Sequence, residues 1–280
     1  MIKILLPTDF SKNSWNAISY ACQLFKDEKC TLVLLNTYKS IPYSDKLVAP
    51  NRSVTGSMDE IKDASINGLE KISQRIENEF NNSKHMISQV SSLNGLTGEI
   101  DEIHEQYGID FIVMGTKGAT GAEKTLFGSN TVDVFNVLKC PVIAVPQDFD
   151  FAIPKEISFF TDYNVLFEES QLQPIIDIAS QYESTVNIIH VNDKKLSYDQ
   201  VDIRNKLEKL FKSTSCALPT EKNKSVPEAI EEYRKEGEVN FLAMINNQHS
   251  FFENLFFKNK INQIGFQLSI PFLVIPSISK

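Results

Sequence analysis

The chain has 280 residues, 42% of them hydrophobic and 23% charged, and a formal net charge of −8. The negative charge argues against a protein that binds the phosphate backbone of nucleic acids, because such proteins carry a basic patch. The sequence also contains no apolar run of the roughly 18 residues that a membrane span requires.

These totals favour an ordinary globular protein with one large domain or two of average size. The opening MIKILLPTDF has too short an apolar part for a secretory signal, so we expect a cytoplasmic protein. The four cysteines lack the spacing of a disulfide framework or a zinc site. The four histidines lack the spacing of metal ligands, so no metal site is predicted.

Short apolar runs alternate with amphipathic patterns along the first half of the chain. The apolar runs predict strands at 2–7, 31–38, 86–92, 110–115 and 141–146. The amphipathic patterns predict helices at 11–26, 61–80, 97–107 and 130–138. Near-continuous Ile, Leu and Val indicate strands that are buried on both faces, as in a parallel sheet flanked by helices. The first half is therefore predicted to be a doubly wound α/β domain.

The same pattern restarts after a linker. ISFFTDYN at 157–164 repeats LLPTDFSK at 5–12, which places Asp162 where Asp9 stands. Near the C-terminus, the apolar run IPFLVIP repeats CPVIAVP 130 positions later. We therefore expect a tandem duplication with domains at 1–148 and 155–280. The first domain is about 23 residues longer, and we expect the excess in a polar loop over 39–60.

The segment 114-MGTKGATGAEKTLFGSNT-131 carries four glycines between a predicted strand and a predicted helix. Part of it approaches the phosphate-binding pattern G-x-x-x-x-G-K-[ST], but Glu123 stands where that pattern has glycine, and its carboxylate would repel phosphate. Two alternatives remain, a flexible turn and a phosphate cradle of another kind. The second fits the position well, because open α/β sheets bind ligands at the carboxyl ends of their strands. Glycines there allow backbone N–H groups to approach phosphate oxygens.

The spacing Gly115-x₂-Gly118-x₉-Gly128-Ser129, together with 7-PTDFS-11, resembles the ATP-binding signature of the universal stress proteins. The complete signature occurs in the first half alone. The resemblance implies an α/β fold of two tandem, doubly wound, open parallel-sheet domains of the universal stress protein (adenine nucleotide alpha-hydrolase-like) type. It also implies that the first domain binds ATP, alone or with Mg²⁺.

The resemblance gives each matching residue an expected role. Asp9 would contact the adenosine part of the nucleotide, and either Thr37 or Tyr38 would meet the adenine through its backbone. The other implied positions are Pro7 beside Asp9, Met114 near the base and ribose, and, around the triphosphate, Gly115, Lys117, Gly118, Gly128, Ser129 and Asn130. The alternative for Asp9 is a structural aspartate in a turn or helix cap.

The sequence favours a regulatory binding protein without catalytic residues, or at most a slow ATPase. Fast phosphoryl transfer needs a positioned base and metal-holding carboxylates as well as a cradle. One alternative is an interaction or scaffold protein that does not bind nucleotide. The other is an adenylating enzyme on a related fold, although its Ser-Gly-Gly loop and H-x-G-H pair are not found in the expected places.

The second half is expected not to hold ATP. Counted 130 positions on, Gly115, Gly118 and Gly128 become Ile245, Gln248 and Lys258, and Ser129 becomes Asn259. In the family the last strands pair across a dimer axis, so the resemblance also implies that the two proline-bounded runs pair within this chain. The expected assembly is an intramolecular pseudo-dimer, and a homodimer through another surface stays open.

Overall fold

The computed structural model describes residues 1–38, 58–116, 127–137, 139–164, 166–191, 195–217, 220–221, 226–235, 239–246 and 269–277. The first half contains β1 (Ile2–Pro7), α1 (Lys12–Leu24), β2 (Cys30–Thr37), α2 (Met58–Phe80), β3 (His85–Ser92), α3 (Leu96–Tyr107), β4 (Phe111–Gly115), α4 (Ser129–Val137) and β5 (Val142–Val145). The second half contains β6 (Glu156–Phe160), α5 (Glu169–Tyr182), β7 (Thr185–Val191), α6 (Tyr198–Leu210), a 3₁₀ turn (Phe211–Ser213), β8 (Ser215–Ala217), β9 (Thr220–Glu221), α7 (Val226–Lys235), β10 (Phe241–Asn246) and β11 (Phe272–Pro276).

Local sequence signals set several helix ends. The Ser11 side chain accepts a hydrogen bond from the backbone N–H of Ser14, so α1 begins at an N-cap serine. Helix α3 ends at Gly108, whose φ of 65° lies in the left-handed region that glycine adopts without steric cost. The predicted strands and helices of the first half are all present. One correction concerns the expected loop over 39–60, because α2 already begins at Met58; residues 39–57 lie outside the described part.

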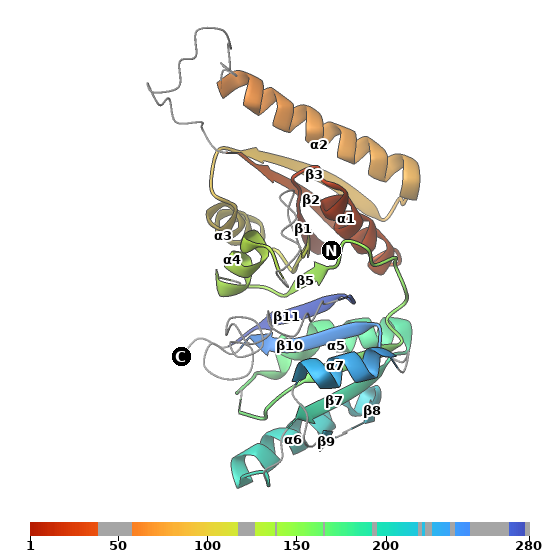
Figure 1. Ribbon diagram of the computed structural model, residues 1–280. Helices are drawn as coiled ribbons and strands as arrows, with labels where there is room; N and C mark the ends of the chain where they lie inside the picture. Colours follow the sequence, from red (N-terminus) through yellow and green to blue (C-terminus); the bar gives the residue numbers. More distant parts are fainter. Residues whose placement is uncertain are drawn as a thin grey trace.

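One sheet runs through both halves (Figure 1), in the order β3-β2-β1-β4-β5-β11-β10-β6-β7-β8, with β9 paired to β7. Each half repeats the 3-2-1-4-5 order of a doubly wound domain. The registers repeat as well: Ile112 pairs with Val142 between β4 and β5, and Leu242 pairs with Phe272 between β10 and β11. The fold is thus two α/β sheets of the same topology placed edge to edge.

The halves meet where the two proline-bounded strands pair. Strand β11 runs antiparallel to β5, with Leu273 opposite Ile143, whereas the other strand pairs between described residues are parallel. Pairing covers two edges that would otherwise expose unpaired backbone groups. The expected contact between the last strands of the two halves is therefore present.

The apolar core forms two layers, one on each face of the sheet, and both layers cross the junction between the halves. Helices α1, α2, α5 and α6 contribute to one layer, and α3, α4 and α7 to the other. The linker between the halves is packed onto α1, since the rings of Phe149 and Phe151 lie edge-on to Tyr20. Across the junction, the Tyr182 hydroxyl of α5 donates to the Leu24 carbonyl at the end of α1.

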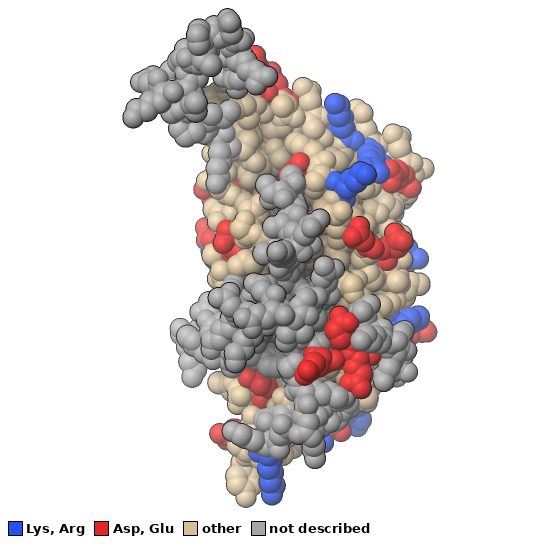
Figure 2. Space-filling model, viewed as in Figure 1, with Lys and Arg blue, Asp and Glu red and all other residues tan. Residues whose placement is uncertain are grey.

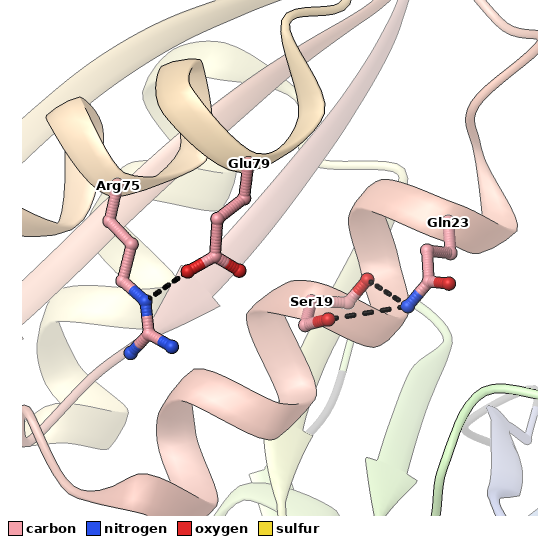
Figure 3. A network of polar contacts seen from close by, with 4 residues as sticks. All are labelled: Ser19, Gln23, Arg75 and Glu79. Carbon is pink, nitrogen blue, oxygen red and sulfur yellow. Dashed lines mark hydrogen bonds and ion pairs between the residues drawn. The ribbon is translucent and has the colours of Figure 1, made fainter.

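Helix α2 packs across α1 through a mixed contact. The Arg75 guanidinium lies 3.7 Å from the centre of the Trp15 ring, and its Nε donates to Glu79 over 2.6 Å. Figure 3 shows Arg75 and Glu79 on α2 facing the part of α1 that carries Ser19 and Gln23. The Arg75–Glu79 pair lies within α2, so the cation–π contact with Trp15 and the buried stripe of α2 hold this helix against α1.

No helix in the described part of the chain has both the length and the apolar character needed to cross a membrane. On the face drawn in Figure 2, acidic side chains gather over the region that α7 occupies in Figure 1. The sequence of α7, VPEAIEEYRK, contains three glutamates. Part of the negative charge is therefore concentrated on the second half.

Candidate functional site

A cleft of about 110 Å³ opens at the carboxyl ends of β1, β2 and β4. It lies at the point where the strand order reverses, since β1 has β2 on one side and β4 on the other. Such switch points are where open α/β sheets leave room for a ligand. The described residues that line it are Pro7, Thr8, Asp9, Ser14, Leu35, Asn36, Thr37, Leu96, Met114, Gly115, Asn130 and Thr131.

The turn after β1 brings Asp9 to the cleft. The backbone N–H of Ser11 donates to Asp9 Oδ1 over 3.1 Å, and the N–H of Phe10 donates to Thr8 Oγ1 over 3.0 Å. Phe10 has a φ of 63°, an uncommon conformation for an aromatic residue. Its ring lies against Gly68 of α2, where an added Cβ would come within 2.4 Å of the ring. The turn is thus held by its own side chains and by a close contact with α2.

The end of β2 forms another wall. Asn36 is buried and its Nδ2 donates to the Thr8 carbonyl over 2.7 Å, which ties β2 to the turn after β1. Thr37 follows and lines the cleft. The backbone N–H of Tyr38 donates to the Ser92 carbonyl over 3.0 Å. Of the two positions expected to meet an adenine, Thr37 therefore lies at the cleft, and the N–H of Tyr38 is engaged in the sheet.

Gly115 ends β4 at a crowded point. A Cβ there would lie 2.6 Å from Asn13 Cγ of α1, and Asn13 is only 3% exposed. The Gly115 carbonyl also accepts a hydrogen bond from Thr131 Oγ1 of α4 over 3.0 Å. The described structure therefore gives Gly115 a packing reason for being glycine: β4 must approach α1 closely. The sequence had suggested a different reason, close approach to phosphate.

Helix α4 starts beside the cleft. The Gly128 N–H donates to the Thr116 carbonyl over 2.7 Å, and the Val132 N–H donates to the Gly128 carbonyl over 3.1 Å. The N–H groups of Ser129, Asn130 and Thr131 consequently have no acceptor within the helix. The first turn also contains no acidic residue. This helix start presents backbone donors and the positive end of the helix dipole, which suits an anion.

Six of the ten residues expected at the site line the cleft: Pro7, Asp9, Thr37, Met114, Gly115 and Asn130. Gly128 and Ser129 lie directly before Asn130 at the start of α4 but do not line the cleft. Lys117 and Gly118 lie outside the described residues. The sequence reasoning missed several lining residues, among them Thr8, Asn36, Leu96 and Thr131. Thr8 and Asn36 adjoin residues that were chosen, and their place next to the ends of β1 and β2 was a usable signal.

Comparison with known proteins gives the family. The sequence model of the universal stress protein family matches residues 1–146. Universal stress protein MJ0577 of Methanocaldococcus jannaschii is 27% identical over 153 residues, which cover 52% of this chain and 94% of that protein. Universal stress protein MJ0531 of the same organism is 28% identical over 146 residues, which cover 52% of this chain and 82% of that protein.

Solved structures extend the likeness to both halves. The crystal structure of a universal stress protein from Archaeoglobus fulgidus matches with a TM-score of 0.69 and 18% identity, covering 98% of this chain and 96% of that one. A functionally unknown protein from Pseudomonas aeruginosa, PA1789, matches with a TM-score of 0.56 and 12% identity, covering 98% of this chain and 92% of that one. At these identities the likeness establishes the fold of the whole chain. The match of the family's sequence model over residues 1–146 shows that the chain belongs to the universal stress protein family.

Proposed function

We propose that this chain is a regulatory protein that binds ATP in the cleft of its first half, without catalysis or with slow hydrolysis. The observation that carries the proposal is the meeting of Asp9, Thr37, Met114 and Asn130 in one cleft at the switch point of the sheet. By the family resemblance, these residues would contact an adenine nucleotide. Residues far apart in the sequence thus converge in one cleft, which supports the proposal.

The described residues fit the parts of a nucleotide. Leu35, Leu96 and Met114 offer apolar surface of the kind that a flat base needs. Thr8, Asp9 and Thr37 offer oxygen atoms suited to a sugar. The start of α4 offers backbone donors to an anion. A cleft with apolar walls and a few polar groups is typical of a cofactor site.

The proposal also includes Lys117 and Gly118 as phosphate-binding residues. Their inclusion rests on the sequence alone, because both lie outside the described residues. Mg²⁺, if it accompanies ATP, would neutralise phosphate charge. Within the described residues, no group of three His, Cys, Asp or Glu side chains is placed to hold a metal. The chain's own contribution to phosphate binding would therefore come from the glycine loop and the start of α4.

We assign the two domains to residues 1–148 and 155–280 and treat them as an intramolecular pseudo-dimer. The antiparallel pairing of β5 with β11 and the core layers that cross the junction support this assignment. We further propose that the second domain does not hold ATP in the family manner. Its residue equivalent to Gly115 is Ile245, a bulky side chain that is 7% exposed. We therefore propose that each chain binds one ATP and that the protein works in the cytoplasm.

The test is to identify the ligand that the purified protein carries and then to count it. The ligand released from the protein by denaturation is analysed by mass spectrometry, and ligand-free protein is titrated with ATP in a calorimeter. We expect ATP to be released and one ATP to bind per chain. An acyl-adenylate would favour the adenylating enzyme, and failure to bind any adenine nucleotide would favour an interaction protein. Two equal ATP sites would contradict the assignment of the second domain.

A further inference from the structure

The start of α4 rests on an aromatic cluster that the second half completes. Phe127 directly precedes Gly128, and its ring meets the Phe135 ring edge-on with centres 5.2 Å apart. Phe272, the first residue of β11, stacks on Phe127 with ring centres 6.3 Å apart and meets Phe135 at the same distance. All three rings are at most 6% exposed. Aromatic contacts of this kind fix the relative position of the elements that carry them.

A second contact holds the other end of α4. Asn246, the last residue of β10, is 7% exposed, and its Nδ2 donates to the Phe135 carbonyl over 2.7 Å. The Phe135 carbonyl belongs to the last turn of α4, where carbonyls have no partner within the helix. The second half therefore supplies both an apolar support for Phe127, two residues before α4, and a hydrogen bond to its final turn.

The first half holds the helix start from the other side. Gly128 N–H donates to the Thr116 carbonyl, and Thr131 Oγ1 donates to the Gly115 carbonyl, so the first turn is tied to the end of β4. Thr131 also lines the cleft. A displacement of α4 along its axis would thus move donors at the cleft, and Phe272 and Asn246 restrain that displacement.

We propose that Phe272 and Asn246 are positioning residues for the first half's ligand: they hold the start of α4 where its N–H groups meet the phosphates. This inference rests on the proposed function and adds a role for the second half, which would otherwise only shield an edge of the sheet. The residues act through α4, so their loss affects the contacts to phosphate and spares those to the nucleoside.

The experiment compares ATP with adenosine as ligands of the full chain. Phe272→Leu and Asn246→Ala are expected to weaken ATP binding about fivefold each, because residues that bias a shared element typically change coupling by that order. The affinity for adenosine should stay within about twofold, since Asp9 lies in the turn after β1 and Thr37 at the end of β2, away from α4 in the chain. Phe241→Leu is the matched control, because Phe241 is a buried phenylalanine of the same half in the opposite core layer.

The control variant should bind both ligands as the natural chain does. Unchanged ATP affinity in Phe272→Leu and Asn246→Ala would overturn the inference. An equal loss of ATP and adenosine affinity would also overturn it, because it would indicate a general loss of structure. If the natural chain bound neither ligand, the proposed function and this inference would fall together, which is distinguishable from a failure confined to the variants.

Discussion

The turn after β1 and the turn after β6 have the same geometry, although they lie in halves with different expected functions. Asp162 Oδ1 accepts a hydrogen bond from the Asn164 N–H over 2.9 Å, as Asp9 does from Ser11 over 3.1 Å. The residue after the aspartate has a φ of 56° in the second half and 63° in the first. The aspartate turn is therefore a feature of the fold, and by itself it does not indicate a nucleotide.

The aromatic residue in each turn lies differently. Phe10 is 40% exposed and packs on Gly68 of α2. Tyr163 is 3% exposed, and its ring centre lies 4.7 Å from that of His190. His190 Nδ1 donates to the Thr161 carbonyl, as Asn36 Nδ2 of β2 donates to the Thr8 carbonyl in the first half. The second turn is thus packed inward on its own half. The two turns therefore share a backbone conformation and differ in the side chains packed around them.

The largest expected effect comes from the glycine loop. Gly118→Val should weaken ATP binding at least about a hundredfold, because a Cβ there would block the approach of the backbone to phosphate. Gln248→Val, the change at the equivalent position of the second half, should leave binding as it is. Calorimetric titration of both variants decides the matter. Equal ATP affinities in the two variants would remove the distinction between the halves.

Gly115→Ala should destabilise the fold by about 1–3 kcal/mol, because its Cβ would overlap the buried Asn13 side chain and overpacking costs this much. Urea unfolding measures the change. Gly98→Ala in α3 is the control, since a Cβ there would have no atom closer than 3.6 Å and alanine favours helices. If Gly115→Ala were as stable as the natural chain, the packing explanation for this glycine would be wrong.

Asp9→Ala and Asp162→Ala remove the same turn hydrogen bond from the two halves. Only Asp9→Ala should weaken ATP binding, by about tenfold, which is the order of one lost polar contact to a ligand. Asp162→Ala shows what loss of the same turn hydrogen bond costs in the half without the cleft. Unchanged ATP affinity in Asp9→Ala would show that Asp9 does not contact the ligand.

The smallest expected effect is on alkaline stability. Burial raises the pKa of Tyr163 from 10.0 to about 12. The unfolded chain therefore releases this proton first, and stability falls as the pH rises from 10 toward 12. Tyr163→Phe should reduce that fall by about 1 kcal/mol. Tyr198→Phe, at a side chain that is 92% exposed, should not.

Urea unfolding at about pH 9 and about pH 11 gives the comparison between these two tyrosine variants. An identical pH dependence in Tyr163→Phe and the natural chain would show that Tyr163 does not stay neutral in the folded protein. Phe10, at the same place in the first half, has no hydroxyl and makes no such contribution. This measurement therefore tests the difference between the buried Tyr163 after β6 and the exposed Phe10 after β1.

The sequence alone determined the alternation of strands and helices, the parallel sheet and the internal repetition. These properties follow from periodicity, local turn signals and internal repetition, which can be read without knowing which distant residues meet. A turn role for Asp9 was an alternative that the sequence left open, and the hydrogen bonds of that turn each span two residues.

Only the tertiary structure decided which side chains share the cleft and what supports it. Leu96 and Thr131 come from separate elements, and no local pattern marks them as neighbours. Gly115 must be small because of Asn13, about a hundred positions earlier in the chain. Phe272 supports Phe127 across the junction of the halves. Such contacts are set by how packed layers fit together, and that fit depends on shape and volume in three dimensions.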